Sequence, residues 1–520
     1  MATSTPDDPF GIDALQERLE TSLEMGGDDK VDRQHAKERL TARERIAQLL
    51  DPGSFVEMGQ LAHSDLKEAS AKTPADGKIC GMGTIAGKTV CVTSDDVTVM
   101  AGSGGRIGYE KEYQTHEYAR KRGCPSIHLG DGGGARIPDI MGATGMMTFT
   151  VPVSHAPRDR ETPMITLIMG ECYGGPTWKA SVSDIVIQVK GSVMAVSGPP
   201  VLKAATREEV TPAELGGWEM HARKTGLVDL FAETDEEALA LAKKVLTYLP
   251  SNAKELPPRK ASTDQAPLAE EELAGIIPQD PRKVYDMHKL LERVVDTDSL
   301  LELKPHFAGS LITALARLDG RVVGLLANNP KVMAGAMGPG ACEKAISFIA
   351  LCDSYHIPLV FVHDTPGFYV SKAAEERKMP QKIMSFIDAI HHSTVPRIGL
   401  IVRKSYGMAH CNMLGARMGA DFLLAWPKAE ISFMSPLVAA EVVLGRKLAQ
   451  SNEPEALRAA FLAEMDRMNA PWEAAGRNLI HRIIDPRETR QELVQCLNIA
   501  CGQDAYRFSE RRLANWPRMT

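Results

Sequence analysis

The chain contains an internal repeat as long as a whole domain. Residues 319–408 align with residues 86–175 at a constant shift of 233 and without gaps, and 20 of the 90 pairs are identical. The longest identical run places Val99-Met100-Ala101-Gly102 on Val332-Met333-Ala334-Gly335. A repeat of this length indicates a duplicated domain rather than a solenoid unit of 20–50 residues. Both halves of the chain should therefore share one fold.

The composition excludes several classes of protein. Hydrophobic residues make up 44% of the chain and charged residues 24%, with a formal net charge of -7, so nucleic-acid binding is not expected. No run approaches the ~20 apolar residues of a membrane span. The nine cysteines include no C-x-x-C pair, which predicts free thiols and no metal site. The first ten residues carry Asp7 and Asp8 but no arginine, so we predict a cytoplasmic protein without a leader.

Changes in residue pattern along the chain divide it into four parts. Residues 1–75 are predicted as an N-terminal helical segment, with one amphipathic helix over 13–50. The first repeat domain is predicted over 76–250 and a proline-containing, charged linker over 251–280. The second repeat domain is predicted over 281–520, and its helical extension from 450 has no counterpart in the repeat register.

Short β-rich runs alternate with helical stretches in both halves, which predicts an α/β fold. In the first half these are strands at Thr89–Thr93, Ser126–Leu129 and Ile165–Met169, with a helix at Tyr109–Arg122. In the second half they are strands at Val322–Ala327, Leu359–His363 and Ile398–Val402, with a helix at Ala341–Tyr355.

A strand runs directly into a glycine turn and a predicted helix in each half. The turns are Gly170-Glu171-Cys172-Tyr173-Gly174-Gly175 and Arg403-Lys404-Ser405-Tyr406-Gly407-Met408-Ala409. Glycine lets the backbone approach a ligand closely. The first N–H groups of a helix have no partner within the helix, so they suit a developing oxyanion. Each such donor can contribute roughly 3–4 kcal/mol to a transition state.

A second glycine cluster lies at the end of the preceding strand in each half. These clusters are Asp131-Gly132-Gly133-Gly134-Ala135-Arg136 and Asp364-Thr365-Pro366-Gly367-Phe368. Neither half fits a Walker A loop or a first-turn G-x-G-x-x-G, which argues against a nucleotide site. Ser197 and Ser405 lack the nucleophile-elbow pattern, which argues against a serine hydrolase.

Two matched oxyanion sites suit a reaction with two enolate-like species. Transfer of a carboxyl group from carboxybiotin to the α-carbon of an acyl thioester has this requirement. One donor pair would stabilise the ureido oxygen of the departing biotin, and the other would stabilise the thioester enolate. No side chain is needed as a base, because the departing biotin can accept the α-proton.

At these residues the chain resembles the carboxyltransferase (β) subunit of biotin-dependent acyl-CoA carboxylases, the propionyl-CoA and methylcrotonyl-CoA carboxylase group. The resemblance covers roughly residues 33–482. The motifs that carry it are Lys37–Leu50 with Asp51-Pro52-Gly53-Ser54-Phe55, Gly133-Gly134-Ala135-Arg136, Gly174-Gly175, Pro358–Phe368, and Gly419-Ala420-Asp421 with Ala425-Trp426-Pro427. It implies two tandem crotonase-like (ClpP/crotonase) ββα superhelix domains from an internal duplication. It also implies a homohexamer built as a trimer of dimers, with active sites at the dimer interface.

The same resemblance implies roles for individual residues. The implied catalytic donors are Gly174, Gly175, Met408 and Ala409. The residues implied to bind acyl-CoA are Gly133, Gly134, Ala135, Arg136, Tyr173 and Cys411, and those implied to bind biotin are Gly367, Phe368, Tyr406 and Gly407. For Arg136, a contact with a CoA phosphate and a structural ion pair are both open.

Four positions depart from the family pattern. Gly132 replaces a serine in the first cluster, and Met408 replaces the second glycine of a Gly-Gly-Ala that is typical of propionyl-type enzymes. Cys411 stands where such enzymes carry an aspartate linked to substrate choice. Trp178 follows the first Gly-Gly near the expected acyl pocket. The acyl substrate is therefore left open.

The chain lacks two parts of a complete carboxylase. It has no Met-Lys dipeptide of a biotinylation site and no glycine-rich ATP-binding loop. We therefore expect a biotin carboxylase and a biotin carboxyl carrier as partner subunits, with biotin carried on the partner and coenzyme A arriving as part of the substrate.

Three other functions are retained as alternatives. The α subunit of a biotin-dependent acyl-CoA decarboxylase runs the same half-reaction backwards, and a membrane partner would identify it. A crotonase-type hydratase or isomerase would need a carboxylate in its pocket, and the duplication argues against it. An inactive assembly scaffold would not need intact glycine turns in both halves.

Overall fold

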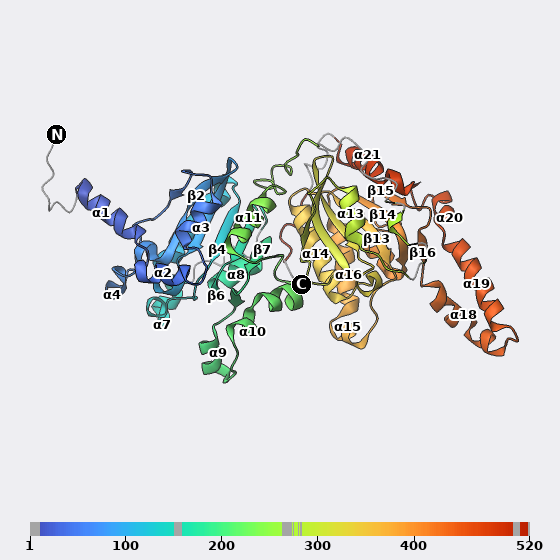
Figure 1. The fold of residues 1–520 in the computed structure, drawn as a ribbon, viewed down its shortest axis with the longest axis horizontal. Helices are drawn as coiled ribbons and strands as arrows, with labels where there is room; N and C mark the ends of the chain where they lie inside the picture. The colour runs from blue at the N-terminus through green and yellow to red at the C-terminus, as the bar shows by residue number, and fades with distance from the viewer. Residues whose placement is uncertain are drawn as a thin grey trace. The chain divides into compact units, whose positions relative to one another are not determined.

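The chain folds into two compact units, Met1–Ala253 and Lys254–Thr520 (Figure 1). The structure is a computed structural model that describes residues 11–149, 159–262, 273, 275–278, 280, 283–502 and 510–517. Part of the predicted linker over 251–280, namely 263–272, 274 and 279, lies outside the described residues. No helix in the described ranges is both long and apolar enough to cross a membrane.

The first unit is built on a seven-stranded sheet with the order β1-β2-β3-β4-β5-β7-β9. The strands are β1 (Val56–Glu57), β2 (Lys78–Ile85), β3 (Lys88–Asp95), β4 (Ser126–Gly130), β5 (Met164–Ile168), β7 (Ile185–Val189) and β9 (Leu230–Ala232). A hairpin joins β2 to β3 antiparallel, and from β3 onward every pairing is parallel. Strands β6 (Glu171–Tyr173) and β8 (Val193–Ala195) form a separate parallel pair. The predicted strands and the α/β class are confirmed.

The second unit repeats this sheet strand for strand. Its order is β10-β11-β12-β13-β14-β15-β17, with β16 (Glu430–Ser432) pairing to β14. The strands are β10 (Leu301–Leu303), β11 (Leu311–Leu318), β12 (Arg321–Asn328), β13 (Leu359–Thr365), β14 (Arg397–Tyr406), β15 (Phe422–Ala425) and β17 (Arg482–Ile483). The predicted duplication of one α/β fold is confirmed. Most of these strands are buried along their length, which explains why they read as continuous apolar runs.

The structural repeat extends beyond the sequence register in both directions. Helix α3 (Ala42–Leu49) and β1 correspond to α13 (Met287–Val294) and β10. Near the other end, β9 and α11 (Asp235–Leu246) correspond to β17 and α21 (Thr489–Cys501). The constant shift of 233 misses both pairs because the connecting segments differ in length. Part of the extension from residue 450 therefore has a counterpart.

The predicted single helix over 13–50 is wrong, because this segment forms three helices. They are α1 (Ile12–Leu23), α2 (Asp28–His35) and α3. Gly27 has φ +90° between the first two, a conformation that ends an α-helix. The side chain of Thr41 caps α3 by accepting from the Glu44 N–H, and the Glu44 carboxylate accepts from the Thr41 N–H.

Lys111 and Lys344 occupy equivalent positions in the two repeats, and both are buried. Lys111 in α5 (Arg106–Arg122) donates to the carbonyl oxygens of Gly59 and Ala75, at 2.9 and 3.0 Å. Lys344 in α14 (Pro339–Ser354) donates to the carbonyl oxygens of Lys304 and Phe307, at 2.9 and 3.1 Å. Each ammonium satisfies loop carbonyls that would otherwise be buried without a donor.

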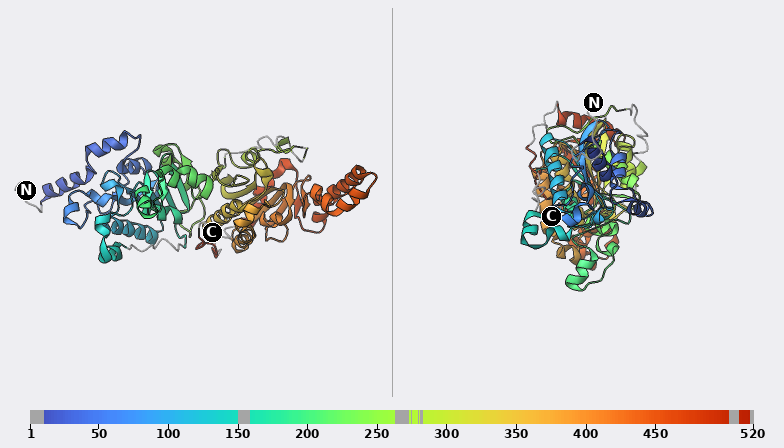
Figure 2. Two further views of the ribbon diagram at one scale, coloured as in Figure 1. Left: turned by 90° about the horizontal axis from the view of Figure 1, so that it is seen from below. Right: turned by 90° about the vertical axis from the view of Figure 1, so that its left-hand side faces the viewer.

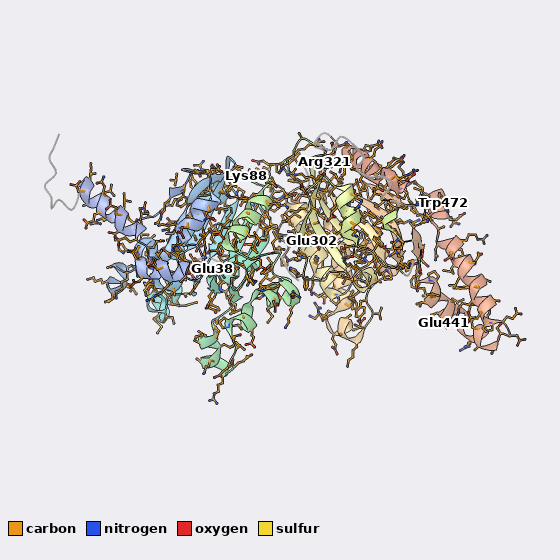
Figure 3. The ribbon with its side chains drawn as sticks, viewed as in Figure 1. Glu38, Lys88, Glu302, Arg321, Glu441 and Trp472 are labelled. Atoms are coloured by element: carbon orange, nitrogen blue, oxygen red, sulfur yellow. The ribbon has the colours of Figure 1, made fainter. Side chains whose placement is uncertain are left out.

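Helices α18 (Pro436–Gln450) and α19 (Pro454–Asn469) pack together and project from the sheet of the second unit (Figures 1 and 2). Glu441 in α18 and Trp472 in α20 (Pro471–Gly476) mark this projection in Figure 3. Large apolar side chains are exposed along it and at its base, namely Phe433, Leu437, Val438, Val442, Val443, Met468 and Trp472. A surface of this kind is typical of a protein–protein interface.

Candidate active site

The glycine turn of the first unit links β6 to α8 (Gly175–Val182). Gly174 has φ +67° and ψ -110°, a conformation that favours glycine. Its N–H donates to the Ala195 carbonyl at 3.1 Å, so this N–H is not available to a substrate oxygen. The Gly175 N–H at the start of α8 has no acceptor among the described residues. Of the two donors implied by the resemblance, Gly175 is therefore the one whose N–H is open.

The upstream cluster lies against this turn. Gly134 has φ +94°, and a Cβ added there would lie 3.2 Å from the Tyr173 carbonyl oxygen. The Gly134 N–H also has no acceptor among the described residues, whereas the Gly133 N–H donates to the Ala101 carbonyl at 3.0 Å. Glycine at 134 therefore allows the two glycine segments to approach each other, and it leaves a second N–H for a ligand.

Both clusters line one pocket of about 780 Å³. Its wall is largely apolar, and the backbone of Gly134 and Gly175 contributes to one side. Trp178 lines it and keeps 46% of its surface exposed. Of the residues implied to bind acyl-CoA, Gly133, Gly134, Ala135 and Tyr173 line this pocket, together with the implied catalytic donors Gly174 and Gly175. The structure thus brings together the first-half residues of the predicted site, except Arg136.

Arg136 takes the ion-pair role. Its guanidinium donates to Asp76 Oδ1 at 2.6 Å and to both carboxylate oxygens of Asp139, at 2.8 and 2.6 Å. The residue is only 2% exposed. Its guanidinium thus joins two carboxylates inside the unit, which is the contact expected of the ion-pair alternative.

The pocket also contains a charged pair that the sequence reasoning missed. Glu112 of α5 and Lys179 of α8 line it and form an ion pair between Lys179 Nζ and Glu112 Oε1. Burial would raise the pKa of Glu112, but the ammonium groups of Lys179 and Lys78 act against burial and hold that pKa well below its ordinary value. The available signal was spacing, since Lys179 stands one helical turn after Gly175.

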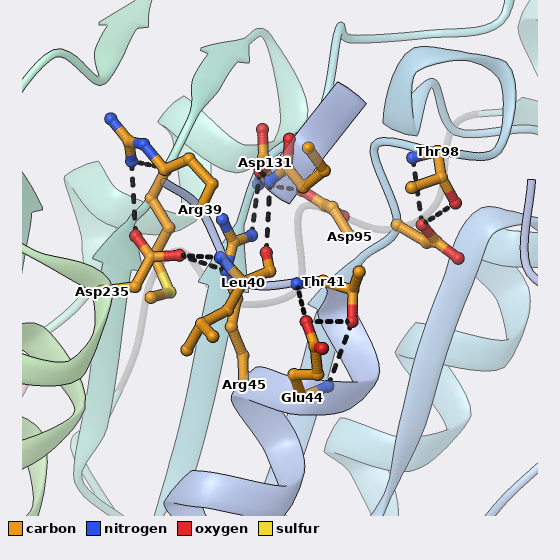
Figure 4. A network of polar contacts seen from close by, with 12 residues as sticks. Arg39, Leu40, Thr41, Glu44, Arg45, Asp95, Thr98, Asp131 and Asp235 are labelled. Carbon is orange, nitrogen blue, oxygen red and sulfur yellow. Dashed lines mark hydrogen bonds and ion pairs between the residues drawn. The ribbon is translucent and has the colours of Figure 1, made fainter. Parts of the chain in front are cut away.

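Asp131, which begins the upstream cluster, is fixed by a buried ionic network (Figure 4). Arg45 Nη1 donates to Asp131 Oδ2 at 2.9 Å, and Arg45 Nε donates to Asp235 Oδ2 at 2.9 Å. Asp131 also receives Gln34 Nε2 at 3.3 Å, while its own N–H donates to Asp95 Oδ2 at 3.2 Å. These contacts tie the glycine cluster to helices α2, α3 and α11.

The second unit presents the matching turn on an uninterrupted strand. Strand β14 continues to Tyr406, and α17 (Gly407–Asn412) follows directly. Gly407 has φ +59° and is equivalent to Gly174, so Met408 is equivalent to Gly175. Met408 is 45% exposed, whereas Ala409 is fully buried.

The upstream cluster of the second unit is held in the same way as the first. Met337 bridges to Phe368 as Gly104 bridges to Ala135. Gly367 has φ +127°, but its N–H donates to its neighbour Thr365 Oγ1 at 3.2 Å. The Gly367 N–H is therefore engaged inside the loop, unlike the Gly134 N–H.

A buried chain of three polar side chains supports α17. Ser405 Oγ lies 2.8 Å from His410 Nδ1 and 3.0 Å from His363 Nδ1. His410 Nε2 accepts from the Ala416 N–H at 3.0 Å, so Nδ1 carries the ring proton and donates to Ser405. Burial lowers the pKa of both histidines, which keeps them neutral. The chain is structural, because Ser405 is fully buried.

The remaining predicted site residues, Tyr173, Tyr406 and Cys411, lie in different environments. The Tyr173 and Tyr406 hydroxyls donate to Glu171 and Glu430, and burial raises the pKa of both phenols. Cys411 is half-buried on α17 of the second unit, whereas the pocket described above belongs to the first unit. Among the described residues, no cluster of three or more His, Cys, Asp or Glu side chains could hold a metal ion.

Comparison with known families decides the assignment. Residues 33–514 match the model of the carboxyl transferase domain, which is well over half of the chain. The chain belongs to the carboxyl transferase domain family. The predicted carboxyltransferase function and crotonase-type fold are thereby confirmed.

Several carboxyl transferase relatives match over almost their whole length. The chain is 36% identical over 496 residues to the methylmalonyl-CoA carboxyltransferase 12S subunit of Propionibacterium freudenreichii subsp. shermanii, covering 94% of each chain. It is 36% identical over 493 residues to the propionyl-CoA carboxylase carboxyltransferase subunit of Haloferax mediterranei, covering 94% of this chain and 95% of that one. It is also 32% identical over 500 residues to methylmalonyl-CoA decarboxylase subunit alpha of Propionigenium modestum, covering 95% and 96%.

A solved carboxyl transferase structure has the same fold. The transcarboxylase 12S hexamer with methylmalonyl-coenzyme A and methylmalonic acid bound superposes with a TM-score of 0.88 at 35% identity. The match covers 96% of each chain. The duplicated units of this chain are therefore those of the carboxyl transferase family.

Proposed function

We propose that this chain is the carboxyltransferase subunit of a biotin-dependent acyl-CoA carboxylase. It would transfer a carboxyl group from carboxybiotin, carried on a partner protein, to the α or vinylogous carbon of an acyl-CoA. The single observation that carries the proposal is the pair of equivalent glycine turns, Gly174-Gly175 and Gly407-Met408, in a chain of the carboxyl transferase family.

The acyl side of the site belongs to the first unit. The pocket suits a CoA thioester because its wall is largely apolar and two open N–H groups, of Gly134 and Gly175, line it. These two N–H groups would donate to the thioester oxygen as it gains negative charge. Gly174 would contribute its turn geometry rather than its N–H.

The biotin side belongs to the second unit. The ureido ring of biotin would fit against the turn that begins α17, because Gly407 has no side chain. The Met408 and Ala409 N–H groups lie in the first turn of α17. These groups would donate to the ureido oxygen, with Gly367, Phe368 and Tyr406 shaping the wall. Biotin, when bound, would supply the carboxyl group that is transferred.

The assembly is proposed to be a homohexamer in which the acyl side of one subunit meets the biotin side of another. The exposed apolar side chains of α18 support such an interface. Partner subunits would provide the biotin carboxylase and biotin carboxyl carrier functions.

A decarboxylase α subunit remains the second candidate, since a relative with that name covers 95% of this chain. A hydratase or isomerase is disfavoured although Glu112 puts a carboxylate in the pocket. The pKa of Glu112 is held well below its ordinary value by the nearby lysines, so it accepts a proton poorly.

Reverse transfer tests the proposal. The full chain is incubated with a high concentration of free biotin and a panel of carboxylated acyl-CoAs, and decarboxylated products are measured by mass spectrometry. Biotin-dependent turnover of at least one thioester is expected. No turnover across the panel, from a folded hexamer, would contradict the carboxyltransferase assignment.

A variant pair tests the biotin-side donors. Ala409→Pro removes one N–H in the first turn of α17, whereas Ala409→Gly keeps that N–H. Loss of one oxyanion donor should lower the turnover number by about 10²–10³-fold in the proline variant only. Normal transfer by a folded Ala409→Pro hexamer would mean that this N–H has no role.

A further inference from the structure

The acyl pocket has a polar end that its apolar walls do not explain. Glu112 and Lys179 line the pocket, yet they are only 2% and 9% exposed. Each residue is charged, and Lys179 Nζ pairs with Glu112 Oε1. Burying two charges is costly unless further hydrogen bonds satisfy them. A pocket for an unsubstituted hydrocarbon chain would therefore gain nothing from this pair, whose desolvation lowers the stability of the fold.

The pair lies close to the reacting end of the pocket. Lys179 is four residues after Gly175 on α8, which places it one turn, or about 6 Å, along the helix. Glu112 is three residues after Tyr109 on α5, and the Tyr109 hydroxyl points toward Gly175. An acyl group whose thioester oxygen faces Gly175 would thus reach the pair with its first few carbons.

The pair keeps unused hydrogen-bonding capacity. Glu112 Oε2 is buried and has no hydrogen-bond partner among the described residues. The Lys179 ammonium has three N–H donors, and Glu112 is the one ion-pair partner it has in the described part of the chain. The pair therefore offers a free acceptor and free donors side by side at the same end of the pocket.

The charges around the pair leave no excess of either sign. Lys78 is paired with Asp95, and Glu112 with Lys179. His128, whose Nδ1 lies 3.3 Å from Glu112 Oε1, is neutral because burial lowers its pKa to about 4. Glu112 would repel a carboxylate on the substrate, and Lys179 would repel an ammonium. The ion pair has no net charge that could offset either repulsion.

We propose that this polar end binds a hydroxyl group on the acyl chain, which donates to Glu112 and accepts from Lys179. A hydroxyl is the smallest group that does both. The inference deepens the proposed function, on which it rests, by naming hydroxyacyl-CoA thioesters as the substrate class. An unsubstituted acyl chain would leave Glu112 Oε2 and the remaining Lys179 N–H donors without a partner, which sites of this kind penalise.

Equilibrium binding tests this inference without requiring turnover. The Kd values of butyryl-CoA and 3-hydroxybutyryl-CoA, which differ by one hydroxyl, are measured by titration calorimetry on the full chain. The hydroxylated thioester is expected to bind about ten- to a hundredfold more tightly. Equal binding, tighter binding of butyryl-CoA, or still tighter binding of the carboxylate-bearing succinyl-CoA would overturn the inference.

A double variant locates the effect. Glu112→Leu with Lys179→Met replaces the ion pair by apolar side chains of similar size, an exchange that buried pairs often tolerate. This variant should bind butyryl-CoA as tightly as, or more tightly than, 3-hydroxybutyryl-CoA. Ser197→Ala, which removes another polar group that lines the pocket, should keep the preference. An unchanged preference in the double variant would refute the assignment to this pair.

The two proposals fail in different ways. Biotin-dependent transfer together with tighter binding of butyryl-CoA would leave the carboxyltransferase assignment standing and remove the hydroxyacyl assignment. Tighter binding of 3-hydroxybutyryl-CoA without any transfer would support the pocket assignment and contradict the carboxyl transfer.

Discussion

Asp131 and Asp364 occupy equivalent positions in the two units, yet each takes its positive partner from a different part of the fold. Asp131 pairs with Arg45 of α3, 86 residues earlier in the chain, at 2.9 Å. Asp364 pairs with Arg403 of β14, 39 residues later, also at 2.9 Å. The residue equivalent to Arg403 is Gly170, where an added Cβ would lie 1.7 Å from Asp131 Oδ1. Glycine at 170 therefore makes room for the Asp131 carboxylate, whose guanidinium partner comes from the N-terminal helices.

The first prediction concerns this charge compensation in the second unit. Arg403→Met leaves the buried Asp364 carboxylate without its cationic partner, and with the Tyr285 hydroxyl at 2.7 Å and the Lys404 N–H at 3.3 Å as remaining donors. Removing one partner of a buried pair should lower the free energy of unfolding by about 3–5 kcal/mol. Urea unfolding followed by circular dichroism measures this loss.

Two further variants test the reason for the loss. Asp364→Asn in the Arg403→Met background should recover part of the stability, because the buried charge is gone. Arg467→Met breaks an ion pair with Glu464 that is exposed on α19, so its unfolding midpoint should not move. No recovery in the double variant would mean that lost packing, not the unpaired charge, causes the loss.

The second prediction concerns the stability of the second unit at alkaline pH. His288 lies between Glu302 Oε2, at 2.8 Å, and Asp286 Oδ1, at 2.7 Å, and these bonds raise its pKa to about 9. A raised pKa of a base stabilises the fold fully below the unfolded value near 6.5, and this contribution is lost as the pH rises through 9. After allowance for solvent screening it is about 1–2 kcal/mol.

The variant His288→Gln makes this contribution measurable. The wild type should exceed the variant in unfolding free energy below pH 6.5, and the difference should fall between pH 6.5 and 9. A difference that stays constant from pH 6 to pH 10 would show that His288 is not protonated in the folded protein.

The third prediction concerns the acyl-side turn. A Cβ at Gly175 would lie 2.8 Å from the Tyr109 hydroxyl oxygen and 3.3 Å from the nearest ring carbon. Gly175→Ala should therefore shift the start of α8 and lower kcat/KM of reverse transfer by about tenfold, since a 1 Å misplacement in a positioned site can cost about 10²-fold. Tyr109→Phe in the same chain removes the closest contact and should restore part of the activity. If the double variant is as inactive as Gly175→Ala, the contact with Tyr109 is not the cause.

The fourth prediction concerns Ser405 as a positioning residue. Ser405→Ala interrupts the chain from His363 to His410 and should shift α17, because His410 loses its acceptor. We expect the KM for biotin to rise several-fold while the KM for the acyl-CoA is unchanged. Thr489→Val removes the acceptor of Trp426 Nε1 in the same unit and serves as a control for general destabilisation. Equal changes in both KM values would show that Ser405 acts only on stability.

The sequence predicts the duplicated α/β architecture well because buried parallel strands are continuous apolar runs at equivalent positions. The single helix predicted over 13–50 overlooked two local signals, the Gly26-Gly27 pair before α2 and the capping box of Thr41 and Glu44 at the start of α3. The correspondence of β17 with β9 is invisible because two short strands carry little pattern of their own.

Local motifs locate both glycine turns of the site but do not tell which N–H groups are open. The Ala195 carbonyl accepts from the Gly174 N–H, and Thr365 Oγ1 accepts from the Gly367 N–H. Both contacts depend on neighbouring strands and on loop closure. The pair of Glu112 and Lys179 is 67 residues apart in the sequence and meets only when α5 and α8 pack on the sheet. Contacts of this kind are set by tertiary structure, so periodicity cannot reveal them.

The contact between Arg45 and Asp235 also determines when the first unit can complete its folding during synthesis. The two residues are 190 positions apart, and they join α3 to α11 (Figure 4). At ordinary rates of translation, roughly 10–40 s separate the appearance of the arginine from that of its carboxylate. During this interval Arg45 of α3 has no Asp235 to pair with, so the N-terminal helices cannot complete their ionic contacts until α11 has been synthesised. The second unit has no such delay for Asp364, because Arg403 follows it within two strands.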